Sequence, residues 1–159
     1  MIWIMKDDLK EIISDYLAKG EFTKPLMIVA TSKQFSSNEI VDECKSWIYE
    51  NYKAYHIQGH PFNQGNKYCF IDGKTERIKD NPEILNSVIV PEGAEGAQLL
   101  LYHRYFDQFD LNHLEFVVAL SYKLQKPAIC LVNDYSYAKC KDEESFLSSF
   151  EICKYNAKL

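Results

Sequence analysis

The sequence predicts an α/β protein, a three-layer α-β-α sandwich built around a mainly parallel sheet of about five strands. Short apolar runs without polar alternation recur along the chain, and this pattern is typical of strands buried on both faces. Amphipathic stretches at helical spacing separate these runs. Because strands and helices alternate in this way, we expect parallel strands covered by helices on both faces, the flavodoxin/Rossmann-like arrangement.

The bulk composition indicates one domain, residues 1–159, with an ordinary globular make-up of 47% hydrophobic and 26% charged residues. The net charge of -5 argues against a nucleic-acid partner, because such surfaces are basic. The five cysteines are odd in number and irregularly spaced, which favours reduced thiols in a cytoplasmic protein. No run approaches the roughly 18 apolar residues of a membrane span, so we expect no membrane partner.

The first third of the chain contains the first predicted strand–helix–strand unit. Residues 6–19 carry a helical apolar stripe, so residues 1–20 are predicted to be an N-terminal packing helix without chemistry. Residues 25–31, PLMIVAT, form the first buried-type strand. A helix follows, for which Ser36 and Glu39 are the candidate capping box, and residues 53–57 are predicted to be the second strand.

The middle of the chain is a long irregular stretch in which only short elements are predicted. A short strand or hairpin arm at residues 67–72, a short helix from Pro82 and a strand at residues 87–90 are the candidates. The following PEGAEGAQ, residues 91–98, reads either as a turn or as a phosphate cradle. The turn is favoured because its two glutamates would repel a phosphate.

The last third contains the stretch on which the functional hypothesis depends. Residues 99–102 form a buried-type strand, and Asp110 is a good helix N-cap, with Asn112 as the alternative. The helix is expected to end at Gln125-Lys126-Pro127 and to lead into a strand at residues 128–132. Residues 143–157 read as a final helix.

Polar residues at the predicted strand ends mark a ligand-binding edge. Open α/β sheets bind ligands at the carboxyl ends of their strands, and Thr31, Ser32 and Phe35 lie at the carboxyl end of the first predicted strand. Glu115 falls in the first turn of the helix that follows the predicted strand at residues 99–102. It is either an ordinary acid favoured by the helix dipole or a functional carboxylate. His56 and His60 are four residues apart but not on a helix, so a metal site is not expected.

Residues 110–132, DLNHLEFVVALSYKLQKPAICLV, resemble the most recognisable segment of the nucleoside 2-deoxyribosyltransferase family. That segment has an acid, a small residue pair, a glutamate that opens a helix, a Lys-Pro pair and an apolar strand. The elements that match here are Asp110, Glu115, Ala119 and Lys126-Pro127. The chain departs from the family where Asn112 and His113 replace the small pair.

The resemblance implies one nucleoside 2-deoxyribosyltransferase-like domain that transfers or hydrolyses the N-glycosidic bond of 2-deoxyribonucleosides or nucleotides. Glu115 would be the nucleophile that forms a covalent glycosyl-enzyme. The candidates for the second acid, which protonates the base, are Asp110, Asp107, Asp72 and Asp80, and Asp110 is alternatively a ligand of a sugar hydroxyl. The resemblance implies no metal ion and no organic cofactor. It implies that the protein forms a homo-oligomer. Phe35 or Tyr102 would stack on the base. The implied substrate-binding residues are Asp107, Asn112, Phe35, Ser32, Asp80 and Asp72.

Two other function classes remain open from the sequence. The chain could be a catalytically inactive nucleotide-binding or sensor domain on the same fold, which the bulky Asn112-His113 pair would favour. It could also be an interaction protein, in which Glu115 is surface charge and the 11 tyrosines contribute to an interface.

Overall fold

The computed structural model describes residues 2–4, 6–19, 24–31, 37–57, 85–86, 88, 90–103, 111–133, 137–138, 147 and 149–156. Within these ranges the chain forms a six-stranded sheet in the order β1-β6-β2-β5-β4-β3, and every neighbouring pair is parallel. The strands are β1 (Ile2–Ile4), β2 (Leu26–Thr31), β3 (Ala54–His56), β4 (Leu99–His103), β5 (Ala128–Asn133) and β6 (Glu151–Asn156).

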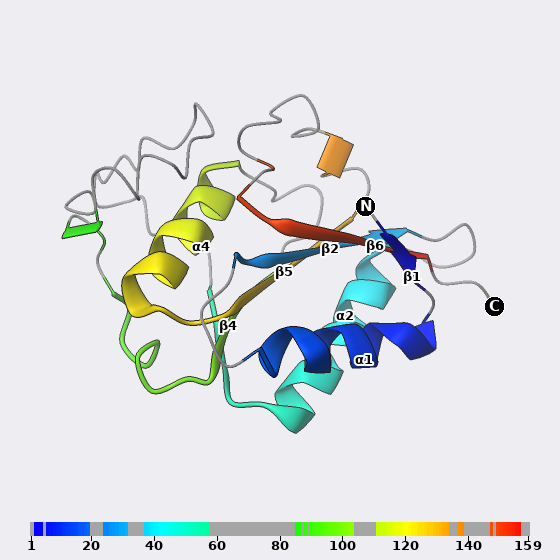
Figure 1. Ribbon diagram of the computed structural model, residues 1–159, viewed down its shortest axis with the longest axis horizontal. Coiled ribbons are helices and arrows are strands. Elements are labelled where there is room, and N and C mark those ends of the chain that lie inside the picture. The colour runs from blue at the N-terminus through cyan, green and yellow to red at the C-terminus, as the bar shows by residue number, and fades with distance from the viewer. Residues whose placement is uncertain are drawn as a thin grey trace.

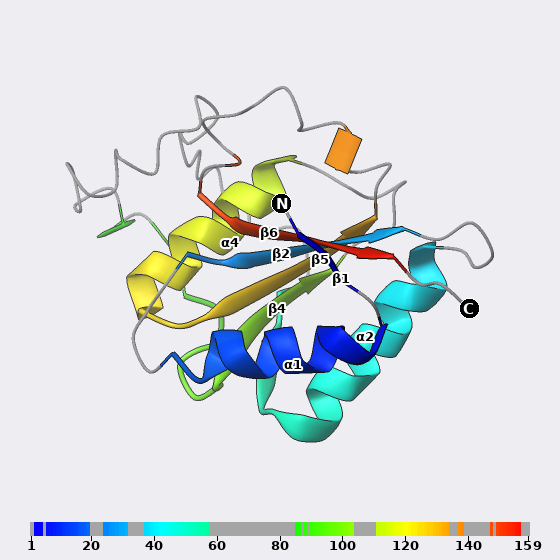
Figure 2. The same ribbon diagram turned by 45° about the vertical axis from the view of Figure 1, so that its right-hand side comes forward.

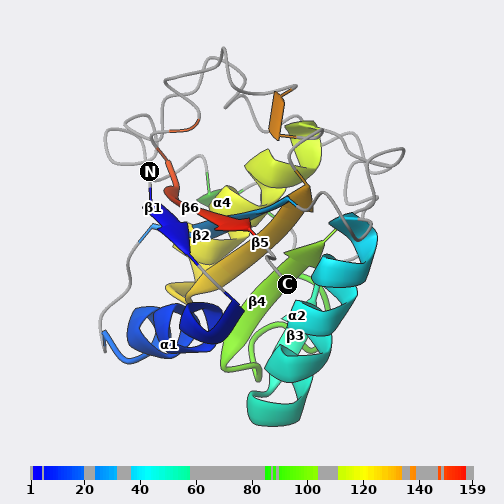
Figure 3. The same ribbon diagram turned by 90° about the vertical axis from the view of Figure 1, so that its right-hand side faces the viewer.

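Helices cover both faces of this sheet. Helices α1 (Lys6–Leu17) and α2 (Ser37–Asn51) lie together on one face, and α4 (Leu111–Leu124) lies on the other. Figure 1 shows α4 and α1 on opposite sides of the strands, and Figure 2 shows α1 and α2 sharing one side. The view in Figure 3, in which α4 lies above the strands and α1 and α2 below them, confirms the predicted three-layer Rossmann-like arrangement.

The core consists of two apolar clusters, one on each face, and the central strands supply both. Along β4, Leu99 and Leu101 face the α1/α2 side, whereas Leu100 and Tyr102 face the α4 side. The same alternation runs along β2 and β5, which explains why their sequences show no polar positions. Each large apolar side chain buried in this way contributes about 1.5–3 kcal/mol.

Helix α4 is apolar on more than one side because other segments cover it. Residues 116–121 are all buried in succession, and Val88 and Phe150 belong to the same cluster. A helix that is apolar around most of its circumference must be enclosed, so α4 lies between the sheet and these covering residues. None of the described helices is long and apolar enough to span a bilayer.

The predicted C-terminal helix over residues 143–157 is wrong for its last part, since residues 151–156 are strand β6. β6 lies between β1 and β2 and is paired along both edges. Its side chains alternate between the faces: Ile152 packs toward the α4 cluster and Cys153 toward the α1/α2 cluster. Over residues 151–156, pairing with two neighbouring strands overrode the predicted helix.

The N-terminal segment also differs from the prediction. Residues 2–4 are strand β1 at an edge of the sheet, and α1, predicted to be a packing helix ahead of the fold, belongs to its core. Ile13 and Tyr16 of α1 are buried in the α1/α2 cluster. The strand predicted at residues 87–90 is not found at residues 88 and 90, the two described positions, whereas the predicted hairpin arm at 67–72 lies outside the described residues.

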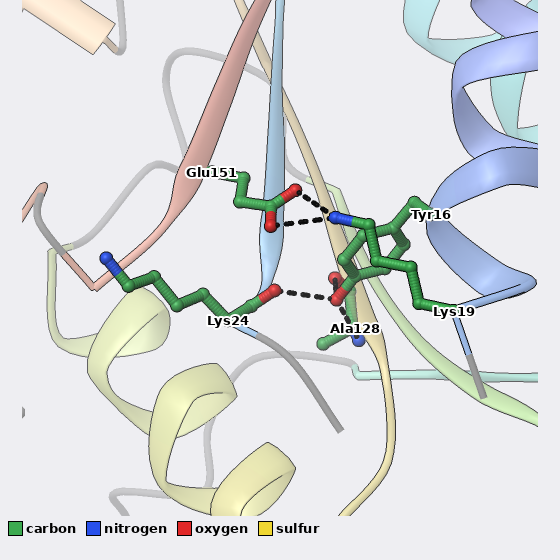
Figure 4. Close-up of polar contacts among 5 residues, drawn as sticks. All are labelled: Tyr16, Lys19, Lys24, Ala128 and Glu151. Carbon is green, nitrogen blue, oxygen red and sulfur yellow. Dashed lines mark hydrogen bonds and ion pairs between the residues drawn. The ribbon is translucent and has the colours of Figure 1, made fainter. Parts of the chain in front are cut away.

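Side chains tie together the amino ends of the strands. The buried Tyr16 hydroxyl donates to the Lys24 carbonyl, 2.9 Å away, and accepts from the Ala128 amide at 3.3 Å, which joins the starts of β2 and β5. Figure 4 shows this hydroxyl between the two strands, with the Lys19–Glu151 ion pair beside it. The Lys19 Nζ lies 3.0 Å from a Glu151 carboxylate oxygen at the start of β6.

A second tie holds the segment before β4 to the end of α4. The Lys126 ammonium donates to the carbonyls of Ala94, Glu95 and Ala97, and the Lys123 ammonium donates to those of Leu85 and Val88. Residues 92–96 form turns, in which Gly93 adopts a φ of 89° that favours glycine. The turn interpretation of PEGAEGAQ is therefore confirmed.

Candidate functional site

The strand order places a topological switch point between β2 and β5. These strands are neighbours, but β2 is followed by α2 on one face, whereas β5 is followed by Tyr137, Leu147 and Phe150, which pack on the α4 face. In open α/β sheets, ligands bind outside the carboxyl ends of strands whose connections diverge in this way. The residues at this position are Thr31 at the end of β2 and Asn133 at the end of β5.

Helix α4 brings Glu115 to the same edge of the sheet. Because α4 connects the end of β4 to the start of the parallel β5, it begins at the carboxyl edge and runs back toward the amino edge. The helix begins at Leu111, so Glu115 is its fifth residue and the first turn contains no acidic residue. The prediction that Glu115 lies in the first turn is thus wrong by about one residue. The prediction that Glu115 lies near the carboxyl edge of the sheet agrees with the structure.

The other predicted site residues are mostly beyond the described ranges. Asn112 is the second residue of α4, inside the first turn, so the alternative that Asn112 is the N-cap is wrong. Tyr102 is completely buried in the α4-face core, so the expectation that it stacks on a base is wrong. The predicted residues outside the described part of the chain are Asp110, Asp107, Ser32, Phe35, Asp72 and Asp80.

The PEGAEGAQ segment lies away from the carboxyl edge. It immediately precedes the start of β4. Three of its carbonyl oxygens accept hydrogen bonds from the ammonium group of Lys126. Carbonyl oxygens bind cations and repel phosphate. This segment is therefore a lysine-binding turn at the amino edge, and the phosphate-cradle alternative is wrong.

Two histidines form a stacked pair at the carboxyl edge, on the face of the sheet that α1 and α2 cover. His56 ends β3 and His103 ends β4, and their rings are 4.2 Å apart between centroids with an interplanar angle of only 2°. His56 is aligned with Leu101, so it lies diagonally next to His103 on the same face of the sheet. His103 is 9% exposed, and the Nε2 atoms of both rings are buried.

The stacking distance limits the charge that the pair can carry. Two imidazolium charges about 4 Å apart repel by about 4 kcal/mol at the effective dielectric constant of a protein surface region. A neutral ring stacked on a charged one avoids this repulsion. The stack therefore disfavours the state in which both rings are charged.

Sequence reasoning missed this pair, because it compared His56 with His60 and not with His103. A signal was present: the dipeptide Tyr-His ends both strands, as Tyr55-His56 and Tyr102-His103. The dipeptide becomes informative only once β3 and β4 are known to be neighbours in the sheet.

Two of the buried thiols in the described part of the chain, Cys130 and Cys153, are unsuited to act as nucleophiles. Complete burial raises the pKa of the Cys130 thiol far above its usual range. Burial also raises the pKa of Cys153, and the nearby Glu151 carboxylate raises it further. Because the thiolate is the reactive form, these two cysteines serve packing and not covalent chemistry. The described residues likewise contain no group of three or more histidine, cysteine or acidic side chains that could hold a metal ion.

Comparison of the chain with protein-family models, curated proteins and solved structures gives no match. The parallel α/β fold, the switch point and the residues at its edge are therefore the observations from which function is inferred. Membership of the nucleoside 2-deoxyribosyltransferase family stays a prediction.

Proposed function

We propose that this protein transfers or hydrolyses the N-glycosidic bond of 2-deoxyribonucleosides or their nucleotides, with Glu115 as the nucleophile. The observation that carries the proposal is the placement of Glu115 near the start of α4, at the carboxyl edge beside the switch point. The resemblance of residues 110–132 to the nucleoside 2-deoxyribosyltransferase family supplies the chemistry for that carboxylate.

The reaction follows from a carboxylate near an anomeric carbon. A Glu115 carboxylate oxygen bonds to C1′ as the bond from C1′ to the base nitrogen breaks, and the bonding pair leaves with the base. A second base or a water then attacks C1′ and releases Glu115, so the anomeric configuration is retained overall. This reaction needs no organic cofactor and no metal ion, and the substrate is a nucleoside or nucleotide.

The substrate position is consistent with the architecture around β2 and β5. A ligand outside the ends of these strands would lie next to the segments that follow Thr31 and Asn133 and next to the first turns of α4. The predicted binding residues Ser32 and Phe35 follow Thr31 directly in the sequence, and Asp107 and Asp110 precede α4. The ends of β2, β4 and β5 and the start of α4 lie at one edge of the sheet.

The test is a turnover assay on the intact chain. The protein is incubated with each 2-deoxyribonucleoside and its 5′-monophosphate, with and without a free acceptor base, and released or exchanged base is measured by liquid chromatography. We expect turnover by the wild type and a loss of about 1000-fold or more in Glu115→Gln, which keeps the size of the side chain but removes the nucleophile.

A matched control is Glu50→Gln, an identical change at an exposed position of α2. It should leave turnover unchanged. Full activity in Glu115→Gln would exclude Glu115 as the nucleophile. Saturable nucleotide binding without any turnover by the wild type would instead favour the sensor-domain alternative. The homo-oligomer implied by the resemblance is tested separately, by analytical ultracentrifugation of the same preparation.

A further inference from the structure

A lysine on an inner strand of the sheet has no role in the reaction as described so far. Lys154 is the only lysine or arginine in the six strands that the structure describes, and it lies on β6, which is paired along both edges. It is aligned with Val29 of β2, which is aligned in turn with Val132 of β5. These valines are 0% and 1% exposed in the α4-face core, so a cation stands in a row of buried apolar side chains.

The position is a costly one for a charge. Lys154 is partly buried, and taking an ammonium group out of water is unfavourable unless other groups compensate for it. The Tyr137 ring stabilises the charge from one side, because the Lys154 Nζ lies 5.5 Å from the centroid of that ring. An ammonium donates three hydrogens, so the ring contact is compatible with an anion bound on another side. Sequences break a local packing rule in this way mostly at functional sites.

We propose that Lys154 binds the 5′-phosphate of the substrate, so that the preferred substrates are 2-deoxyribonucleoside 5′-monophosphates and not the free nucleosides. This inference rests on the proposed glycosyl-transfer function and names the substrate class for it. A phosphate monoester carries close to two negative charges near neutral pH, and its oxygens accept strong hydrogen bonds from ammonium groups.

Lys154 lies on the face of the sheet that α4 covers, near the edge at which α4 begins. Alternate residues of a strand face the same side, and Ile152, two residues earlier, packs toward the α4 cluster. β6 ends at Asn156, so Lys154 is close to the carboxyl edge. α4 carries Glu115 near its start at the same edge and packs on β4 and β5. The cation and the proposed nucleophile thus belong to one face and one edge.

The switch point lies between Lys154 and α4. β2 separates β6 from β5, so Lys154 is about 10 Å across the sheet from β5. The short segment at residues 137–138, orange in Figure 1, lies on the same side of the sheet as α4 in all three views. A nucleotide over the ends of β2 and β5 can therefore direct its phosphate toward Lys154 and its C1′ toward the start of α4, because the sugar separates these two groups.

The experiment compares substrates that differ only in the phosphate. Each 2-deoxyribonucleoside 5′-monophosphate and its free nucleoside are assayed with the wild type and with Lys154→Met, which keeps a long side chain but removes the charge. We expect the wild type to prefer the monophosphate. The variant should lose about 10-fold or more in kcat/KM on the monophosphate, while kcat/KM on the free nucleoside changes by less than about threefold.

Two further variants control for effects on structure and on overall charge. Lys154→Arg keeps the positive charge and should retain the preference for the monophosphate. Lys53→Met, the same change at an exposed lysine of the amino edge, should leave kcat/KM on both substrates unchanged. The circular dichroism spectrum of Lys154→Met, together with its turnover of the free nucleoside, shows that this variant is folded.

The outcomes separate this inference from the proposed function. Equal losses on both substrates in Lys154→Met, as expected if Lys154 only holds the segment around Tyr137, overturn the phosphate-binding role and leave the proposed function standing. An unchanged preference in this variant, or a wild type that does not prefer the monophosphate, overturns it too. A wild type that acts on neither substrate overturns the proposed function and this inference together.

Discussion

The two edges of the sheet are built in different ways. At the amino edge, side chains bind backbone groups of neighbouring segments: Tyr16 joins β2 to β5, and Lys126 holds the turns before β4. At the carboxyl edge, the described side chains that stand out are two stacked histidines, and Glu115 is carried there by α4.

The amino edge therefore contributes mainly to stability, whereas the carboxyl edge holds the residues of the proposed reaction. Bonds from a side chain to main-chain carbonyls hold the strand starts in register, which matters for every function the fold could have. Side chains at the strand ends can differ from one α/β protein to another without disturbing that register. Substitutions at the amino edge should therefore lower stability, and those at the carboxyl edge should mainly change activity.

The largest effect on stability is expected for Lys126→Met at the amino edge. The change removes an ammonium bound by three carbonyls and leaves these oxygens without their donor. Because hydrogen bonds to charged groups are among the stronger ones, the free energy of unfolding should fall by about 3 kcal/mol. Urea denaturation followed by circular dichroism measures it.

A matched control for this change is Lys53→Met, at an exposed lysine on the same edge. It should alter the free energy of unfolding by less than about 0.5 kcal/mol. Equal effects of the two substitutions would show that the Lys126 bonds contribute nothing specific, and the contrast between the edges would lose its main support.

Tyr16→Phe is expected to have the next largest effect. The ring stays buried, but the Lys24 carbonyl and the Ala128 amide lose their shared hydroxyl. We expect a loss of about 1–2 kcal/mol in the free energy of unfolding, with turnover per folded molecule unchanged. Thermal unfolding measures the first quantity and the nucleoside assay the second, and Tyr49→Phe, at an exposed tyrosine, is the control.

The histidine stack should contribute less to stability than either amino-edge tie. In a double-mutant cycle with His56→Ala and His103→Ala at pH 8, where ordinary histidines are neutral, we expect a coupling energy of about 1 kcal/mol or less. Chemical denaturation of the wild type, both single variants and the double variant measures it. A coupling above that of the Tyr16 bonds would mean that the carboxyl edge is also built for stability.

The smallest effect is expected for Lys19→Gln. The Lys19–Glu151 ion pair is well exposed, with side chains 44% and 39% accessible, so water and salt screen it. Its loss should cost about 0.5 kcal/mol or less, and the difference from the wild type should shrink further in 1 M salt. A larger cost that persists in high salt would show that Lys19 acts through packing and not through charge.

The central part of the fold was predictable because its signals are local. β2, β4 and β5 are apolar runs buried on both faces, and α4 ends where Gln125-Lys126-Pro127 follows, with Gln125 at a positive φ of 53°. β1 and β6 were missed because their strand conformation depends on pairing with each other and with β2. A six-residue segment shows no periodicity of apolar residues that would indicate such pairing.

The candidate site was predictable only in outline. The order of β4, α4 and β5 sufficed to place Glu115 near the carboxyl edge, because a parallel crossover must run back along the sheet. The histidine pair could not be predicted, because it depends on β3 and β4 being neighbours in the sheet. These two strands are separated in the sequence by the 42 residues 57–98. The roles of Ser32, Phe35, Asp72, Asp80, Asp107 and Asp110 stay predictions.

The position of β6 has a consequence for the order in which the protein can fold. Ile2 is aligned with Cys153, so among the described strands β1 has its partner near the opposite end of the sequence. During synthesis, β2 to β5 can pair as they emerge, but β1 must wait until β6 is present. Contacts over such long sequence separations slow folding, and the last step of assembly should be the insertion of β6 between β1 and β2.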